Sequence, residues 1–167
     1  VPITNITSDA QTLTLTVTAD YPVPVTRLWE AYSDPRQLEK FWGPREWPAT
    51  FLRHDMAVGG ESHYVMKGPN GEASHGWWRF LAVERQRLIE VEDGFAKPDG
   101  SKDTKLPSMR MRFTFEATAK GSRFVSVTQF HSGSAWNIIP EEAVLRGTIR
   151  SFKPEVQQTV ERAIERL

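Results

Sequence analysis

The side chains best suited to acid–base chemistry or metal binding are four histidines and one carboxylate, namely His54, His63, His75, His131 and Asp93. No two of the histidines form the His-x-His or His-Glu-x-x-His spacing that places two imidazoles on one ion. A metal site would therefore have to be assembled from separate strands. We expect no bound metal and no other cofactor.

Asp93 and His54 are the two weak candidates for catalysis. His54 shares strand parity with Met56, which points it toward the interior, although a surface or hydrogen-bonded histidine is the simpler alternative. Asp93 shares parity with Ile89 on the apolar face of its strand, and a carboxylate desolvated there could act as a general acid or base. The alternative that we favour is that Asp93 begins a turn with Gly94 and accepts backbone hydrogen bonds.

Composition excludes several classes of site and partner. The 167 residues contain no cysteine, which excludes a disulfide framework, a thiolate nucleophile and a cysteine-ligated metal. The sequence has neither a Gly-x-Ser-x-Gly nor a glycine-rich phosphate-binding motif. Its 21 basic and 21 acidic side chains are interspersed, so we expect no nucleic-acid partner. Apolar runs fall short of the ~20 residues that cross a bilayer, and we expect a cytoplasmic protein without membrane contact.

The elements that must position these residues are mostly strands. Period-two patterns predict strands over 13–18, 50–56, 62–66, 77–83, 88–92, 109–115 and 124–130. Helical spacing follows Pro24, and Asp34 is placed to cap a second short helix with Pro35 at its first position. A polar connection is expected from Asp93 to Ser108. Consecutive strands without intervening helices favour an antiparallel sheet.

The C-terminal part returns to a helical pattern. One narrow apolar stripe contains Leu145, Ile149, Phe152, Val156, Val160, Ala163 and Leu167, which predicts a long amphipathic helix with a kink at Pro154. A curved sheet with a long helix across its concave face leaves a cavity, and apolar cavities with a few polar groups bind small molecules.

Four short motifs carry a family resemblance, and their order is more specific than any one of them. They are Phe41-Trp42-Gly43-Pro44, Gly59-Gly60, Gly76-Trp77-Trp78 and Asp93-Gly94-Phe95-Ala96. In this order the sequence resembles the activator-of-heat-shock-protein-90-ATPase family, within the START-like (SRPBCC, helix-grip) superfamily. The resemblance covers residues 12–167 and leaves 1–11 as an N-terminal extension.

The resemblance implies an α+β helix-grip fold. A seven-stranded curved antiparallel sheet with two short helices would grip a long C-terminal helix around a hydrophobic cavity. Two departures concern the cavity mouth and the start of the gripping helix. Residues 55–58 lack the Arg-Pro that often precedes the paired glycines, and residues 131–154 match poorly.

The leading functional hypothesis is a protein that binds an apolar or aromatic small molecule between sheet and helix. An alternative is a cofactor-independent enzyme in which Asp93 or His54 moves protons during a cyclisation, dehydration, elimination or aldol-type reaction. A third hypothesis is a module that activates a chaperone ATPase, and a homodimer is left open. The expected ligand-binding residues are Trp42, Tyr64, Met66, Trp78, Phe95, Met109, Met111, Phe113, Phe130, Trp136, Leu145 and Ile149.

Overall fold

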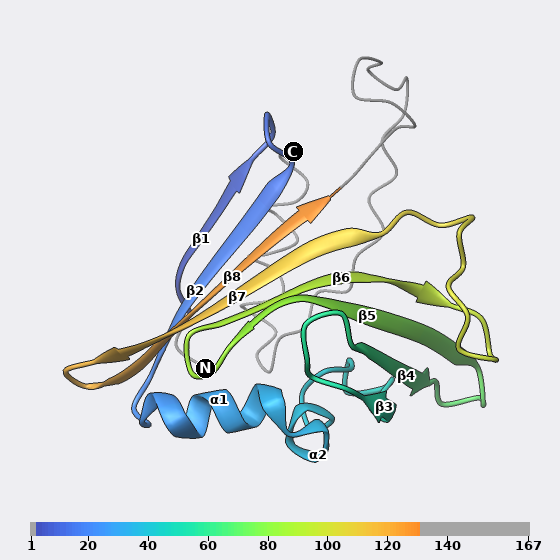
Figure 1. The fold of residues 1–167 in the computed structure, drawn as a ribbon, viewed down its shortest axis with the longest axis horizontal. Coiled ribbons are helices and arrows are strands. Elements are labelled where there is room, and N and C mark those ends of the chain that lie inside the picture. The colour runs from blue at the N-terminus through green and yellow to red at the C-terminus, as the bar shows by residue number, and fades with distance from the viewer. Residues whose placement is uncertain (1–2, 131–167) are drawn as a thin grey trace.

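The computed structural model describes residues 3–130. This part of the chain forms eight strands and two short helices (Figure 1). Their bounds are β1 Ile3–Asp9, β2 Thr14–Tyr21, α1 Val25–Ser33, α2 Pro35–Leu38, β3 Ala49–His54, β4 Glu61–Lys67, β5 Ala73–Glu84, β6 Leu88–Ala96, β7 Met109–Thr118 and β8 Gly121–Phe130.

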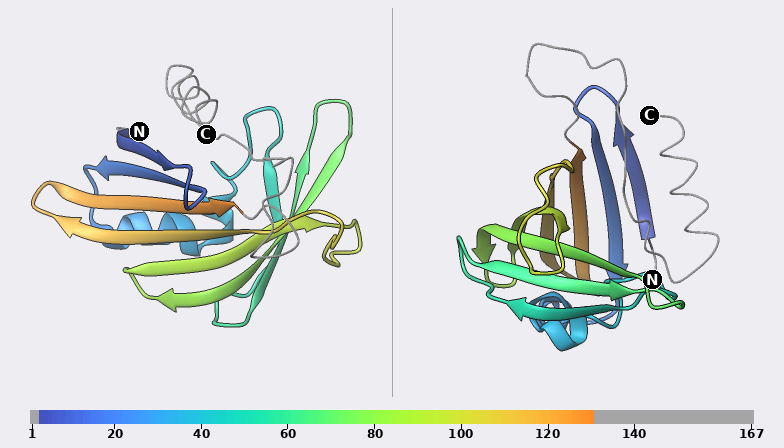
Figure 2. Two further views of the ribbon diagram at one scale, coloured as in Figure 1. Left: turned by 90° about the horizontal axis from the view of Figure 1, so that it is seen from above. Right: turned by 90° about the vertical axis from the view of Figure 1, so that its right-hand side faces the viewer.

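All eight strands belong to one antiparallel sheet with the order β1-β2-β8-β7-β6-β5-β4-β3. The sheet is strongly twisted and curved, and α1 and α2 lie together on one side of it (Figures 1 and 2). The chain forms both helices between β2 and β3, and β2 pairs with β8, the last described strand. The predicted antiparallel sheet is confirmed.

The predicted strand number of seven is wrong, because residues 3–9 form an additional edge strand. β1 pairs with β2, and a register shift between Ile3 and Asn5 marks a bulge. The bulge places both Ile3 and Ile6 on one face, opposite Ala19 and Val17. Since isoleucines three residues apart break the alternation expected of a strand, the period-two pattern did not reveal β1. The boundary drawn at residue 12 between extension and domain stays a prediction.

A second correction concerns the end of β6. The turn expected at Asp93 and Gly94 is not formed, because β6 continues to Ala96. Asp93 pairs with Trp78 of β5 and with Met109 of β7, so both neighbouring strands hold it in the sheet. Tertiary pairing here overrides the local turn preference of an Asp-Gly pair.

The two helices begin as the sequence predicts. In α1, the Pro24 carbonyl accepts a hydrogen bond from the Leu28 amide at 3.1 Å. In α2, the Asp34 carboxylate accepts from the Arg36 amide at 2.9 Å, and Pro35 takes the first helical position. Proline and an N-cap carboxylate suit a helix start because the first amides lack intrahelical partners.

The core lies between the helices and one face of the sheet, which we call the inner face. Helix α1 packs on β7 and β8, and α2 packs on β3. The ring of Trp29 meets Phe115 edge-on at 5.2 Å, and Tyr32 stacks on Phe124 at 4.7 Å. The predicted C-terminal helix and the kink at Pro154 lie outside the described residues.

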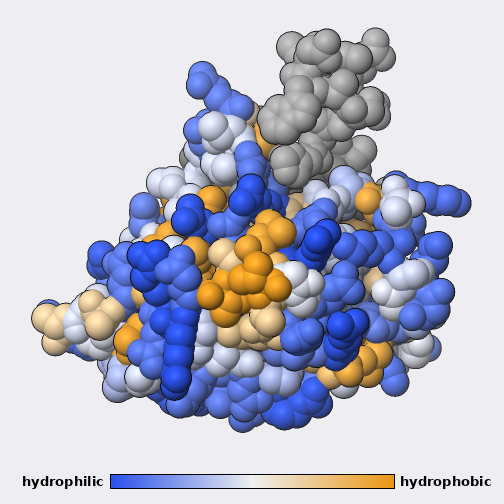
Figure 3. Space-filling view, viewed as in Figure 1, coloured by the Kyte–Doolittle hydropathy of each residue, from blue (hydrophilic) through white to orange (hydrophobic). Residues whose placement is uncertain are grey.

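The face of the molecule seen in Figure 3 is mostly hydrophilic, with apolar side chains gathered in a small patch near its centre. Among the described residues, the exposed large hydrophobics are Leu52, Val58 and Leu81. No helix in the described part of the chain is long and apolar enough to span a membrane.

Candidate functional site

Eight of the twelve expected ligand-binding residues have described side chains, and six of these are buried in the core. The buried six are Trp42, Tyr64, Met66, Trp78, Met111 and Phe113, while Phe95 and Met109 are half-buried. Phe130 ends β8, but its side chain is not described, and Trp136, Leu145 and Ile149 lie outside the described residues. Most of the expected ligand-binding residues whose side chains are described therefore lie in the core beside the inner face.

An aromatic cluster forms the middle of this inner face. Trp42, which follows α2, meets Trp78 edge-on with ring centroids 4.5 Å apart. Its ring also lies 6.3 Å from Phe113 and 6.4 Å from Tyr64, both edge-on. Edge-to-face packing of this kind fixes ring orientation, which gives the inner face a defined aromatic wall.

Asp93 is the buried carboxylate in this wall, with 8% of its surface exposed. One carboxylate oxygen, Oδ1, accepts hydrogen bonds from the Trp78 indole Nε1 at 2.7 Å and from the Tyr64 hydroxyl at 3.1 Å. Two donors directed at one oxygen compensate part of the cost of burying a charge. Asp93 thus lies on the inner, apolar face of its strand and is held by one aromatic donor from each of two strands.

Gly76 allows Tyr64 to reach Asp93. The two residues Tyr64 and Gly76 are cross-strand partners on β4 and β5, and Asp93 lies one strand further on β6. The Tyr64 ring lies so close over Gly76 that a Cβ atom there would stand 2.3 Å from the ring carbon Cζ. A side chain at position 76 would therefore displace the ring from its path to the carboxylate.

His54 also faces the inner side, because of a bulge in β3. The register shifts between Phe51 and Arg53, so that Phe51 and His54 share a face although they are three residues apart. His54 Nδ1 lies 2.9 Å from Ser62 Oγ, and its ring lies 5.6 Å from that of Phe80. The bulge thus confirms the inward direction expected for His54.

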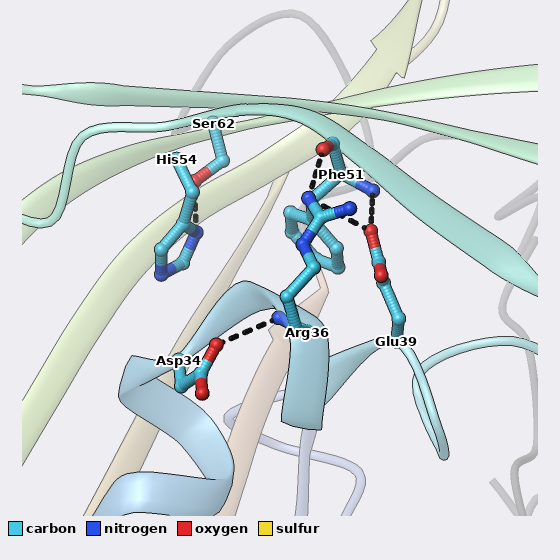
Figure 4. Close-up of polar contacts among 6 residues, drawn as sticks. All are labelled: Asp34, Arg36, Glu39, Phe51, His54 and Ser62. Carbon is cyan, nitrogen blue, oxygen red and sulfur yellow. Dashed lines mark hydrogen bonds and ion pairs between the residues drawn. The ribbon is translucent and has the colours of Figure 1, made fainter.

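Burial lowers the pKa of His54 below its ordinary value, and the nearby Ser33 main chain and Asp34 carboxylate partly oppose this effect. Its Nε2 is buried and has no hydrogen-bond partner within residues 3–130. Figure 4 shows the ring reaching from β3 toward the junction of α1 and α2. The lowered pKa makes His54 a neutral imidazole at pH 7. Trp78 lies between His54 and Asp93 and contacts both.

An ion pair on α2 closes the edge of β3 beside His54 (Figure 4). Arg36 Nη2 donates to the Phe51 carbonyl at 2.6 Å, and the Phe51 amide donates to Glu39 Oε1 at 2.6 Å. Arg36 and Glu39 also contact each other at 3.0 Å. Sequence reasoning missed this contact with the edge strand. The sequence shows that Arg36 and Glu39 are three residues apart, but it does not show that the pair binds the backbone of Phe51.

The outer face of β7 carries the charges that alternate with its methionines. Arg110 and Arg112 both pair with Glu90 of β6, whose own surface is 7% exposed. Met111, on the opposite face, is buried in the core. The alternation of charge and methionine along this strand therefore separates a charged outer face from an apolar inner face.

Comparison with known proteins identifies the family. The family model described as Activator of Hsp90 ATPase homolog 1-like protein matches residues 22–162. The chain belongs to this family. Membership confirms the resemblance carried by the four short motifs, and with it the START-like (SRPBCC) superfamily.

Solved structures of family-like proteins support the same fold. Protein Ms6760 from Mycobacterium smegmatis is 37% identical with a TM-score of 0.70, and the match covers 98% of this chain and 89% of Ms6760. A protein from Arthrobacter aurescens is 35% identical with a TM-score of 0.73, and the match covers 78% of this chain and 76% of that protein. The AHSA1 protein of Silicibacter pomeroyi, 18% identical with a TM-score of 0.59 and covering 72% and 81%, shows the fold alone.

Two curated relatives match a short segment. N-acetylcysteine deacetylase of Bacillus subtilis is 40% identical over 43 residues, which is 26% of this chain and 11% of that protein. The N-acyl-L-amino acid amidohydrolase of Geobacillus stearothermophilus is 42% identical over 43 residues, 26% of this chain and 12% of that protein. The chain thus spans about a tenth of the length of these relatives.

Proposed function

We propose that this family member binds an apolar or aromatic small molecule against its inner face. The observation that supports the proposal most is the aromatic wall around Asp93, in which Trp78 and Tyr64 hold one carboxylate oxygen. Small-molecule sites in proteins combine such apolar walls with a few fixed polar groups. The wall supplies ring faces and edges for an aromatic ligand, and the carboxylate supplies one oriented polar group.

The residues proposed to contact the ligand are those expected from the sequence. Trp42, Trp78 and Phe113 supply flat aromatic surface, and Met111 with Met109 supplies deformable apolar surface beside it. Tyr64 acts mainly by fixing the carboxylate. Phe130, Trp136, Leu145 and Ile149 remain in the proposed set as predictions.

Adjacent tryptophans on β5 provide a matched test of this proposal. Trp78 lies on the inner face beside Asp93, whereas Trp77 lies on the outer face under the Lys102 ammonium, and both are buried. Native mass spectrometry of the purified chain identifies co-purifying compounds, and titration with Nile red measures apolar binding. We expect Trp78→Phe to weaken dye binding and Trp77→Phe to leave it unchanged. Equal affinities of the two variants for the dye would contradict binding at the inner face.

An enzyme that uses the same site is the second candidate, and the burial of Asp93 and His54 favours it. The inner face holds a carboxylate fixed by two donors and an imidazole whose pKa is lowered by burial, and carboxylates and imidazoles are the side chains that most often move protons in enzymes. The test uses the compound found by native mass spectrometry as substrate. Asp93→Asn or His54→Gln is expected to abolish its cyclisation, dehydration, elimination or aldol-type conversion. Full turnover in both variants would remove these two residues as catalysts.

The remaining functional hypotheses stay predictions with direct tests. The name of the family refers to activation of an Hsp90 ATPase, so stimulation of a chaperone ATPase by the purified chain is the assay for the third hypothesis. Light scattering during size-exclusion chromatography tests the homodimer, and cell fractionation tests the cytoplasmic location.

A further inference from the structure

Two histidines from neighbouring strands meet on the outer face of the sheet, away from the proposed ligand site. His63 lies on β4 and His75 on β5, and His63 Nε2 is 3.1 Å from His75 Nδ1. Their rings are stacked with centroids 5.3 Å apart and an interplanar angle of 28°. Both side chains are half-buried, so the pair remains within reach of solvent.

The connection after β6 folds over this pair. Gly100 adopts a φ of +86°, and a Cβ atom there would stand 3.0 Å from His63 Nδ1, so only glycine lets the backbone pass this close. Lys102 anchors the connection, with its ammonium 3.8 Å above the Trp77 ring and 3.7 Å from Glu61. The connection therefore covers one edge of His63 and leaves Nε2 directed at His75.

Charged side chains of both signs surround the pair. Asp99 in the connection lies near enough to His63 to raise its pKa, although burial and the neighbouring His75 lower it more. Arg53 is the cross-strand partner of His63 on β3, and its guanidinium contacts Glu61 and Asp55 at 3.9 Å each. Acidic and basic side chains thus both lie near His63, and among the described residues Asp99 is the carboxylate that acts on its ring directly.

We propose that His63 Nε2 and His75 Nδ1 form a two-histidine site for a divalent transition-metal ion such as Zn²⁺. Two ligand atoms bound to one ion at 2.0–2.1 Å in tetrahedral geometry lie ~3.3 Å apart, close to the separation in this pair. Binding an ion requires each ring to turn about its Cβ–Cγ bond until both lone pairs point at the ion instead of at each other. Imidazole is a preferred ligand of Zn²⁺, Ni²⁺ and Cu²⁺.

The site has two protein ligands, with water at the remaining positions. Within residues 3–130 no group of three or more histidine and carboxylate side chains is arranged to hold an ion. A metal bound by two imidazoles exchanges readily and keeps open positions. An imidazole binds a metal through its deprotonated nitrogen, so protons compete with the ion at both ligands. The proposal differs from the sequence-based expectation of no bound metal, because His63 and His75 become neighbours only through the pairing of β4 with β5.

Isothermal titration of the chelator-treated chain with ZnCl₂ at pH 7.5 tests the site. We expect His63→Gln and His75→Gln each to weaken binding at least about tenfold, the lower end of what loss of a supporting residue costs a metal site. His54→Gln and His131→Gln remove the other two histidines and serve as matched controls that keep wild-type affinity. Both tested histidines lie on the outer face, and a thermal melt of each variant confirms folding.

Long-range ¹H–¹⁵N NMR spectra of the imidazoles give an independent measurement. Addition of ZnCl₂ should shift the resonances of His63 Nε2 and His75 Nδ1 together and leave His63 Nδ1 little changed. Affinity should fall as the pH is lowered, because protons compete with the metal ion for its ligand nitrogens. No binding by the wild type, full affinity in the double variant, or shifts at other nitrogens would each overturn the proposal and leave a pair that only shares a proton.

Discussion

Replacing Gly76 with alanine should disrupt the centre of the candidate site although it adds a single methyl group. A Cβ atom at this position would stand 2.3 Å from Tyr64 Cζ and 2.4 Å from its hydroxyl oxygen. The ring cannot stay where it is, so the Tyr64 hydroxyl must leave Asp93 or the strands must separate. We therefore expect Gly76→Ala to destabilise the fold and to weaken ligand binding at the inner face.

The expected cost combines two unfavourable terms and one smaller favourable term. Overpacking a well-packed core costs about 1–3 kcal/mol. Loss of a hydrogen bond to a buried charged acceptor costs about 1.5–3 kcal/mol more. Alanine restricts the unfolded chain more than glycine does, which returns about 0.4–1 kcal/mol. The free energy of unfolding should therefore fall by about 2–5 kcal/mol, a large part of the ~5–15 kcal/mol typical of a domain.

Urea denaturation followed by circular dichroism measures this loss, and a second substitution identifies its cause. In a Tyr64→Ala background the added methyl group meets no ring, so Gly76→Ala should cost much less there. Ser74→Ala, on the same strand, is the control for an added or altered small side chain. A loss below about 0.5 kcal/mol, the size of an ordinary surface substitution, or an equal loss in both backgrounds, would refute the reasoning.

Three further substitutions test other parts of the structure by urea denaturation. Tyr64→Phe removes one donor from the buried Asp93 carboxylate and should lower the free energy of unfolding by about 1.5–3 kcal/mol. Burial lowers the pKa of His54, so the neutral imidazole contributes its full stability above pH 6.5, and this contribution is lost as the pH falls through the folded-state pKa. His54→Gln should therefore make the free energy of unfolding depend less on pH in this range. An unchanged slope would contradict the reasoning. Glu90→Gln breaks contacts of a buried carboxylate with two arginines and should destabilise the fold clearly more than Asp20→Asn, which breaks an exposed pair with Arg123.

The sequence was sufficient to predict the parts of the fold that depend on local patterns. Helix starts depend on proline and capping side chains, and α1 and α2 begin as Pro24, Asp34 and Pro35 indicate. Alternation along β7 is also local, with Met111 buried on the inner face and Arg112 paired with Glu90 on the outer face. These features involve residues within a few positions of each other, which is where pattern reasoning is informative.

The parts that sequence reasoning missed depend on pairing between distant segments. Asp93 carries a local turn signal, yet its position is fixed by Trp78, fifteen residues earlier, and Met109, sixteen residues later. His63 and His75 became neighbours only through the register of β4 on β5. Such registers are set by the whole sheet, so a single strand pattern does not encode them.

Bulges explain why alternation failed at particular places and why the site has its present composition. Register shifts near Thr4, Leu52 and Leu81 each leave the extra residue exposed on its strand. Beyond each shift the residues that follow change faces, and at Leu52 this change turns His54 inward. With strict alternation after Phe51, the imidazole would point to the outer face, away from Trp78 and Ser62. The extra residue in β3 therefore turns the His54 side chain to the inner face. Such insertions must be located in a sequence before the face of a candidate catalytic side chain can be predicted.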